Sequence, residues 1–89
     1  MPVNIRMLVL DVLKPHKPNI IDFSKRVAEV KGILTADINV EEVDEKTESV
    51  KLIVEGTNID YESLEDLIKE LGGSVHSIDR VRASRKPKG

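Results

Sequence analysis

The chain has no cysteine and no tryptophan, and its only aromatic residues are Phe23 and Tyr61. Without cysteine it cannot use a disulfide, a thiolate metal site or a cysteine nucleophile. Hydrophobic residues make up 39% of the 89 residues and aromatic residues only 2%, so the core must be built from aliphatic side chains. A chain of this length supports one core, which excludes most multidomain enzymes.

Long apolar runs are also missing. The longest, such as residues 7–10, are far shorter than the roughly 20 residues that cross a bilayer. No charged start followed by an apolar stretch and a small-residue cleavage site indicates a signal peptide. We therefore expect a soluble, cytoplasmic protein without a membrane partner.

The net charge of −2 conceals an uneven distribution. Residues 1–36 sum to +3, residues 37–66 to −9 and residues 67–89 to +4. A total near zero argues against nonspecific attraction of the whole domain to nucleic acid, but it leaves local cation and anion sites open.

Hydrophobic periodicity predicts four strands and two helices. The strands are expected over residues 3–13, 33–43, 49–55 and 74–82, and the helices over residues 18–30 and 61–71. The two prolines of the Lys14–Pro18 segment predict a rigid turn after the first strand. The elements form a single domain over residues 1–83, followed by a basic flexible tail over residues 84–89.

The order βαββαβ predicts an α+β fold, a ferredoxin-like sandwich. Its four-stranded antiparallel sheet is expected in the order 4-1-3-2, with both helices on one face. Right-handed crossovers bring the first and third strands together at the centre, and we expect these two to run parallel, with the fourth and second antiparallel at the edges.

Alternation along the strands leaves the second face of the sheet open. This face is expected to carry Met7, Val9, Asp11, Leu13, Asp37, Asn39, Glu41, Lys51, Ile53 and Glu55. An exposed apolar patch on one free sheet face favours burial by self-association, so we expect a homo-oligomer. The alternative is an ordinary scatter of apolar surface residues.

The expected topology brings a candidate metal site to one end of the sheet. If the first and third strands run parallel, Asp11 and Glu55 close them at the end where Asp37 and His76 open the other two strands. Carboxylate oxygens suit Ca²⁺ or Mg²⁺, which are favoured here over Zn²⁺ or Ni²⁺, whereas histidine ligation would reverse that preference. The alternative is a set of solvated or lysine-paired carboxylates.

The orientation of His76 is open at this stage. Matching Ile78 to Ile38 turns His76 toward the helices, whereas turning Val75 and Ser77 inward places it on the open face.

A candidate anion site lies beside the first helix. Lys14, His16 and Lys17 precede its N-terminus, where unpaired N–H groups attract phosphate or carboxylate. The prolines remove donors, and no glycine-rich cradle is present, so a purely conformational role for this turn is the stronger interpretation.

The basic residues near the C-terminus could contact phosphates, but both aromatics fall in the predicted helices and leave no stacking platform on the sheet. Nucleic acid is therefore a disfavoured partner.

The segments 8–18 (LVLDVLKPHKP) and 71–79 (LGGSVHSID) resemble those of the small archaeal domain-of-unknown-function family 211. The resemblance extends over nearly the whole chain to about Val81. It implies a ferredoxin-like fold and symmetric, ring-shaped homo-oligomers, and it implies no particular chemistry.

The sequence thus predicts a non-enzymatic, self-assembling binding module that holds a divalent cation or small ligand at one end of the sheet. A small-molecule regulatory domain of the amino-acid-sensing type, or weak nucleic-acid binding through the tail, is the alternative. A hydrolase built on the carboxylates and histidines rests on residue types alone.

Overall fold

The computed structural model describes residues 2–85. Its elements follow the predicted order: β1 (Asn4–Pro15), α1 (Ile20–Ala28), β2 (Ile33–Val43), β3 (Thr47–Gly56), α2 (Tyr61–Glu70) and β4 (Ser74–Ser84). Ser84, expected in the tail, is the last residue of β4 and pairs with Asn4. The rest of the predicted tail, apart from Arg85, lies outside the described residues.

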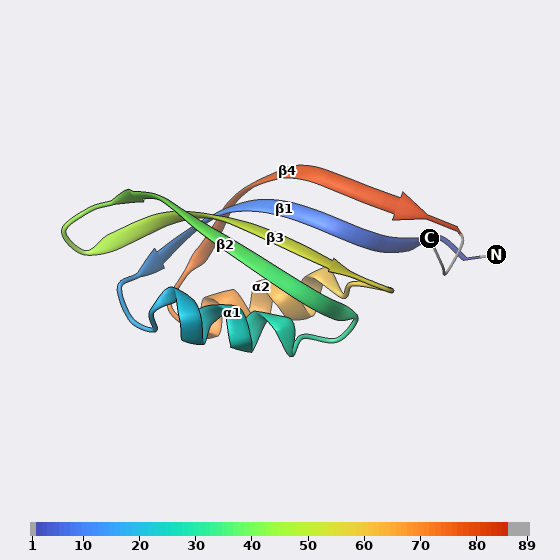
Figure 1. Ribbon diagram of the computed structural model, residues 1–89, viewed down its shortest axis with the longest axis horizontal. Coiled ribbons are helices and arrows are strands. Elements are labelled where there is room, and N and C mark those ends of the chain that lie inside the picture. The colour runs from blue at the N-terminus through green and yellow to red at the C-terminus, as the bar shows by residue number, and fades with distance from the viewer. Residues whose placement is uncertain (1, 86–89) are drawn as a thin grey trace.

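The sheet has the order β2-β3-β1-β4, and both helices lie on one of its faces (Figure 1). The ferredoxin-like α+β fold is thereby confirmed. One detail of the prediction is wrong, because β1 and β3 run antiparallel, with Met7 opposite Glu55 and Leu13 opposite Ser49. Strand direction follows from the chain path: β1 and β2 are joined through a helix and run the same way, and the hairpin then sends β3 back between them.

Local sequence signals explain where the helices begin. Asn19 caps α1, its side chain accepting a hydrogen bond from the Asp22 amide at 2.9 Å. Asp60 caps α2 by accepting from the Ser63 amide at 3.1 Å. These side chains satisfy amides that have no partner within the first turn.

Gly32 is required where the chain turns from α1 into β2. Its φ is +87°, and an added Cβ would lie 1.9 Å from the carbonyl oxygen of Asn58. A side chain would therefore clash with the segment that leads into α2.

The core is aliphatic apart from Phe23, as the composition predicts. It lies between the helices and one face of the sheet and consists of Leu8, Leu10, Val12, Phe23, Val27, Ile33, Val50, Leu52, Val54, Ile59, Leu64 and Ile68. These side chains are 6% exposed or less, and burying each large one stabilises the fold by about 1.5–3 kcal/mol.

The sheet is longer than the helices that cover it. The molecule measures 47 Å along its longest axis and 21 Å and 18 Å along the others. The β2–β3 hairpin projects beyond the helices at one end, and the β1–β4 pair projects at the other (Figure 1). Apolar side chains on these projections, such as Val43 and Val81, are consequently exposed.

Two irregularities in β4 set the direction of its side chains. The register with β1 shifts between the pairs Val9–Arg80 and Leu10–Ile78, and again between Asp11–Ser77 and Val12–Val75. Each shift adds a residue to β4, and a bulge of this kind re-aims the neighbouring side chains. The additional residues are Asp79 and His76.

Candidate functional site

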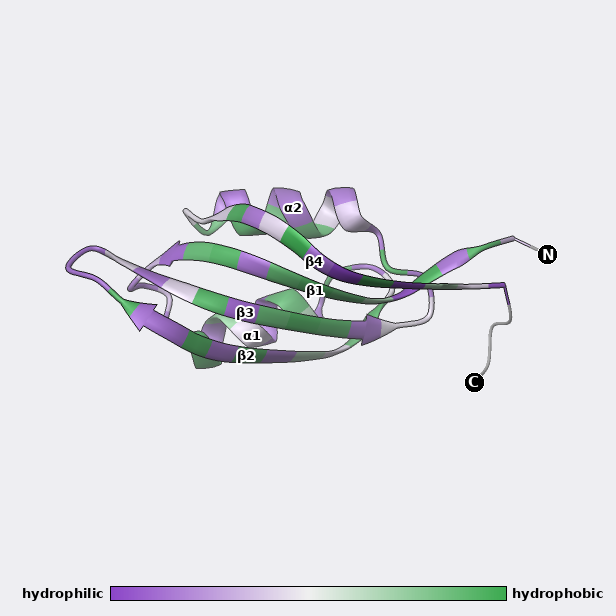
Figure 2. Ribbon diagram, turned by 90° about the horizontal axis from the view of Figure 1, so that it is seen from above, coloured by the Kyte–Doolittle hydropathy of each residue, from purple (hydrophilic) through white to green (hydrophobic). Residues whose placement is uncertain are grey.

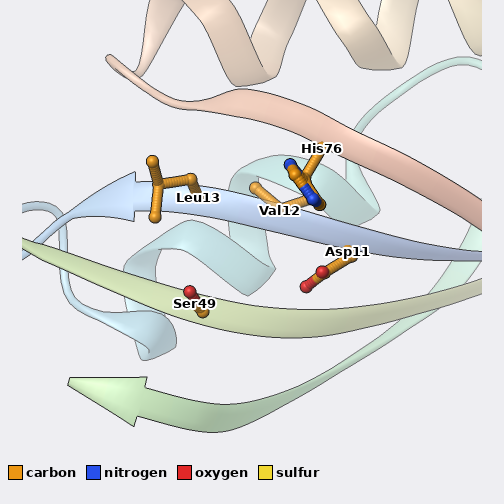
Figure 3. Close-up of a pocket in the computed structure, with 5 residues that line it drawn as sticks. All are labelled: Asp11, Val12, Leu13, Ser49 and His76. Carbon is orange, nitrogen blue, oxygen red and sulfur yellow. The ribbon is translucent and has the colours of Figure 1, made fainter.

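A pocket of about 250 Å³ lies on the face of the sheet that the helices leave open. It is lined by Asp11, Val12, Leu13, Ser49 and His76 (Figure 3). Three neighbouring strands therefore contribute to it: β1 at the centre, β3 on one side and β4 on the other.

The bulge in β4 settles the orientation of His76. Val75 packs against the core, whereas His76 is exposed and lines the open-face pocket with Asp11. Alternation alone could not decide this orientation, because an extra residue breaks the two-residue period.

The other two predicted metal ligands lie elsewhere on the sheet. Glu55 is opposite Met7, which is four residues, or about 13 Å, from Asp11 along β1. Asp37 on β2 is opposite Ile53 on β3, which is in turn opposite Val9 on β1. This position is about 12 Å from Asp11. The expected convergence of all four residues is wrong, because it relied on a parallel pair of central strands. Within residues 2–85, no three His, Asp or Glu side chains are grouped so that they could hold a metal ion.

The pocket nevertheless combines three chemical groups that sequence reasoning only partly identified. Asp11 supplies a carboxylate, His76 an imidazole and Ser49 a hydroxyl, while Leu13 forms an apolar wall. Ser49 was missed, although its place one residue before the Val50–Val54 alternation puts it on the open face. Two metal-ligating side chains are fewer than the three or four of a complete site.

A row of ion pairs crosses the open face beside this pocket. The Lys51 ammonium lies 4.0 Å from Glu41 and 3.9 Å from Asp79. Asp79 also accepts a hydrogen bond from the Ser77 hydroxyl at 2.8 Å. These solvated contacts contribute little to stability, but they fix Asp79 beside Lys51 rather than in the pocket.

The predicted anion-binding residues meet a carboxylate of the same chain. Lys14 is fully buried, and its Nζ donates to the Pro15 carbonyl at 2.7 Å and lies 3.2 Å from Glu48 Oε1. The Lys14 ammonium also lies 5.6 Å from the centre of the Phe23 ring. His16 Nδ1 lies 3.0 Å from Glu48 Oε2.

These contacts change the acidity of both partners. The hydrogen bond from His16 and that from Lys14 hold the pKa of the Glu48 carboxyl below its usual 4.5. The hydrogen bond to Glu48, followed by that to the Glu45 carbonyl, raises the pKa of His16 above 6.5. Glu48 therefore lies beside Lys14 and His16, where the sequence suggests an external anion, and Lys17 is exposed.

The two edge strands of the sheet differ in charge. β2 carries Asp37, Glu41 and Glu42 and no basic residue, whereas β4 carries Arg80 and Arg82. Seen from the open face, β2 is the outermost element at one edge of the sheet, whereas α2 lies beyond β4 along part of the other edge (Figure 2).

Asp37 and Arg80 occupy matching positions on these edges. They lie at the two ends of one row of paired residues across the sheet, which runs Asp37, Ile53, Val9, Arg80. Within residues 2–85, neither Asp37 nor Arg80 takes part in an ion pair.

No helix in the described part of the chain is long and apolar enough to cross a membrane.

Comparison with known proteins places these features in a family. The model of domain-of-unknown-function family 211, described as uncharacterized ArCR, matches residues 6–86. The chain is also 44% identical over 82 residues to the uncharacterized protein MJ0319 of Methanocaldococcus jannaschii, an alignment that covers 92% of this chain and 84% of that protein. The chain thus belongs to domain-of-unknown-function family 211.

Proposed function

We propose that the chain is a cytoplasmic, non-enzymatic binding module that assembles with itself, the sheet of one copy continuing into the sheet of the next. The observation that carries this proposal is that the two edge strands, β2 and β4, complement each other in direction, apolar surface and charge.

Strand direction favours a continuous sheet. Neighbouring strands alternate in direction across the order β2-β3-β1-β4, so β2 and β4 run in opposite directions. Placing β2 of one copy beside β4 of another extends the antiparallel pattern without a break. Each edge strand is 11 residues long and presents a row of unpaired backbone groups, which is a template for pairing.

Exposed apolar side chains are concentrated on the same two strands. Within the described residues, five of the eight large hydrophobic side chains that are strongly exposed lie on β2 or β4, namely Leu34, Val40, Val43, Ile78 and Val81. The open face offers less, because Met7 is only 4% exposed and Val9 and Ile53 are half-buried. The edges therefore support self-association better than the face on which the sequence-based expectation relied.

Charge complementarity sets the register of the contact. In an unstaggered join, Arg80 of one copy lies beside Asp37 of the next on the open face. Opposite charges at this point favour the contact, and the same edge presented to itself would place like charges together. A contact between two different edges is heterologous, so it closes into a ring or continues as a filament.

Charge-reversal variants test this contact. We expect Arg80→Glu and Asp37→Arg each to weaken assembly severalfold, and the double variant to recover it, because the double variant restores the attraction with the charges exchanged. Sedimentation velocity at matched concentrations measures the effect, with Lys25→Glu on α1 as the control. Assembly that is equally strong in all variants, or a double variant weaker than either single one, would contradict an edge contact in this register.

The pocket of Asp11, Ser49 and His76 supports a second part of the proposal, a small site on the open face. Because Asp37 and Glu55 lie elsewhere, the oxygen-rich set that suits Ca²⁺ or Mg²⁺ is not gathered within one chain. An imidazole beside a carboxylate suits Zn²⁺ or Ni²⁺, with further donors coming from water or a neighbouring copy. An amino-acid-sensing domain would use the same pocket for an organic ligand.

Calorimetric titration with Zn²⁺, Ni²⁺, Mn²⁺, Ca²⁺ and Mg²⁺ tests the pocket. We expect binding by the wild type and a rise in its melting temperature. Asp11→Asn and His76→Gln should each weaken binding by about tenfold or more, and Asp66→Asn on α2 should leave it unchanged. If no ion binds the wild type, or if Asp66→Asn is as damaging as Asp11→Asn, the metal site is refuted. The same titration with free amino acids tests the organic alternative.

A further inference from the structure

His16 joins the end of β1 to the β2–β3 hairpin. Its Nδ1 lies 3.0 Å from Glu48 Oε2 on β3, and its Nε2 lies 2.9 Å from the backbone carbonyl oxygen of Glu45 in the connection between β2 and β3. The imidazole thus bridges the first residues of β3 and the tip of the hairpin.

Both partners of the ring can only accept hydrogen bonds. A backbone carbonyl has no proton to give, and an ionised carboxylate has none either. The ring must therefore donate from both nitrogens, which only the protonated imidazolium can do. In the neutral ring only one nitrogen carries a proton. The Glu48 carboxylate is a stronger acceptor than the Glu45 carbonyl, so the proton stays on Nδ1 and the contact of Nε2 with Glu45 is lost.

From this geometry we propose that His16 is a pH-sensitive clasp, which holds the hairpin connection against the end of β1 while protonated and releases it on losing its proton.

The surrounding groups confine the change to the hairpin. Glu48 contacts His16 through Oε2 and Lys14 through Oε1, so it keeps its buried partner when His16 becomes neutral. On the hairpin side, His16 contacts the Glu45 carbonyl, and the backbone of Asp44 also raises the pKa of His16. From α1, the Phe23 ring lies against the Lys14 ammonium. The Asp44 amide donates to the Thr47 carbonyl at 2.8 Å, which keeps the turn itself closed.

The direction of the pH effect follows from linkage. The Glu48 hydrogen bond raises the pKa of His16 above the 6.5 of a free histidine. The clasp is therefore complete below about pH 6.5 and is lost as the pH rises through the pKa of the folded protein. Complete deprotonation of His16 should raise the ratio of detached to attached hairpin by about tenfold for each unit by which the pKa in the folded protein exceeds 6.5.

Nuclear magnetic resonance measures this directly, because the chain has only two histidines. We expect both ring nitrogens of His16 to carry protons at pH 5.5. Contacts between the His16 ring and Glu45, and the backbone order of residues 44–46, should decrease as His16 titrates above pH 6.5. The backbone order at Leu52 in the middle of the sheet should not change.

Two variants separate the clasp from a general effect of pH. His16→Gln should abolish the pH dependence at residues 44–46, and because the His16 side chain is 40% exposed, this variant should fold. His76→Gln removes the other histidine and should leave the pH dependence intact. The proposal is overturned if His16 titrates at or below pH 6.5, if residues 44–46 keep the same order from pH 5.5 to 8.5, or if His16→Gln behaves like the wild type.

Discussion

At the residue scale, Lys14 shows how much alternation can predict. Lys14 continues the series Leu8, Leu10 and Val12 on the helix side of β1, and Glu48 continues the corresponding series on β3. The register makes Lys14 and Glu48 direct partners. The period of two therefore predicts that Lys14 is buried beside Glu48, although a lysine next to a proline turn is more often an exposed cation.

The Lys14–Glu48 pair predicts an asymmetric response to mutation. Glu48→Ala leaves the buried Lys14 ammonium without its carboxylate and should lower the free energy of unfolding by about 1–3 kcal/mol. Lys14→Met keeps the apolar stem against Phe23 and leaves Glu48 with His16, so its effect should stay within about 1 kcal/mol. Denaturant unfolding at pH 7 measures both.

Glu55→Ala is the matched control for this pair, because Glu55 is an exposed acidic residue on the same strand. If Glu48→Ala costs no more than Glu55→Ala, the buried pair does not stabilise the fold.

At the element scale, periodicity predicted all six elements, and β2 agrees at both ends with the expected residues 33–43. It could not predict the two bulges of β4, since these depend on how β4 pairs with β1 rather than on its own sequence. The direction of β3 was available from the hairpin. Because β3 runs antiparallel to β1, Asp37 and Glu55 lie away from Asp11, and the expected four-residue metal site does not form.

The helix caps provide a test at the same scale. The chain has a similar segment before each helix, beginning at Asn19 and at Asn58, yet only Asn19 is a cap, because Asp60 caps α2. Asn19→Ala should therefore lower the free energy of unfolding by about 1 kcal/mol, whereas Asn19→Asp keeps the acceptor and should change it by a few tenths.

Asn58→Ala is the control for the cap and should change the free energy of unfolding by less than about 0.5 kcal/mol in denaturant unfolding. Equal losses for Asn19→Ala and Asn58→Ala would show that the Asn19 side chain does not cap α1.

At the scale of the whole molecule, the sheet extends past its helices at both ends, and β2 and β4 are its edge strands (Figure 1). Composition predicted an aliphatic core and alternation along the strands predicted self-association, but the location of the exposed apolar side chains required the three-dimensional structure. An acidic β2 and a basic β4 explain why a net charge of −2 is uninformative, since it averages two edge strands of opposite charge. The proposed assembly uses both surfaces in each contact.

The central claim is therefore that this chain assembles with itself in solution, and its mass tests that claim most directly. Light scattering on a sizing column at micromolar concentration should give a multiple of 10.0 kDa. The mass should decrease on dilution or at high salt, which screens the edge charges. A constant mass of 10.0 kDa at all concentrations up to about 100 µM, which corresponds to a contact weaker than about −5.5 kcal/mol, would contradict the account.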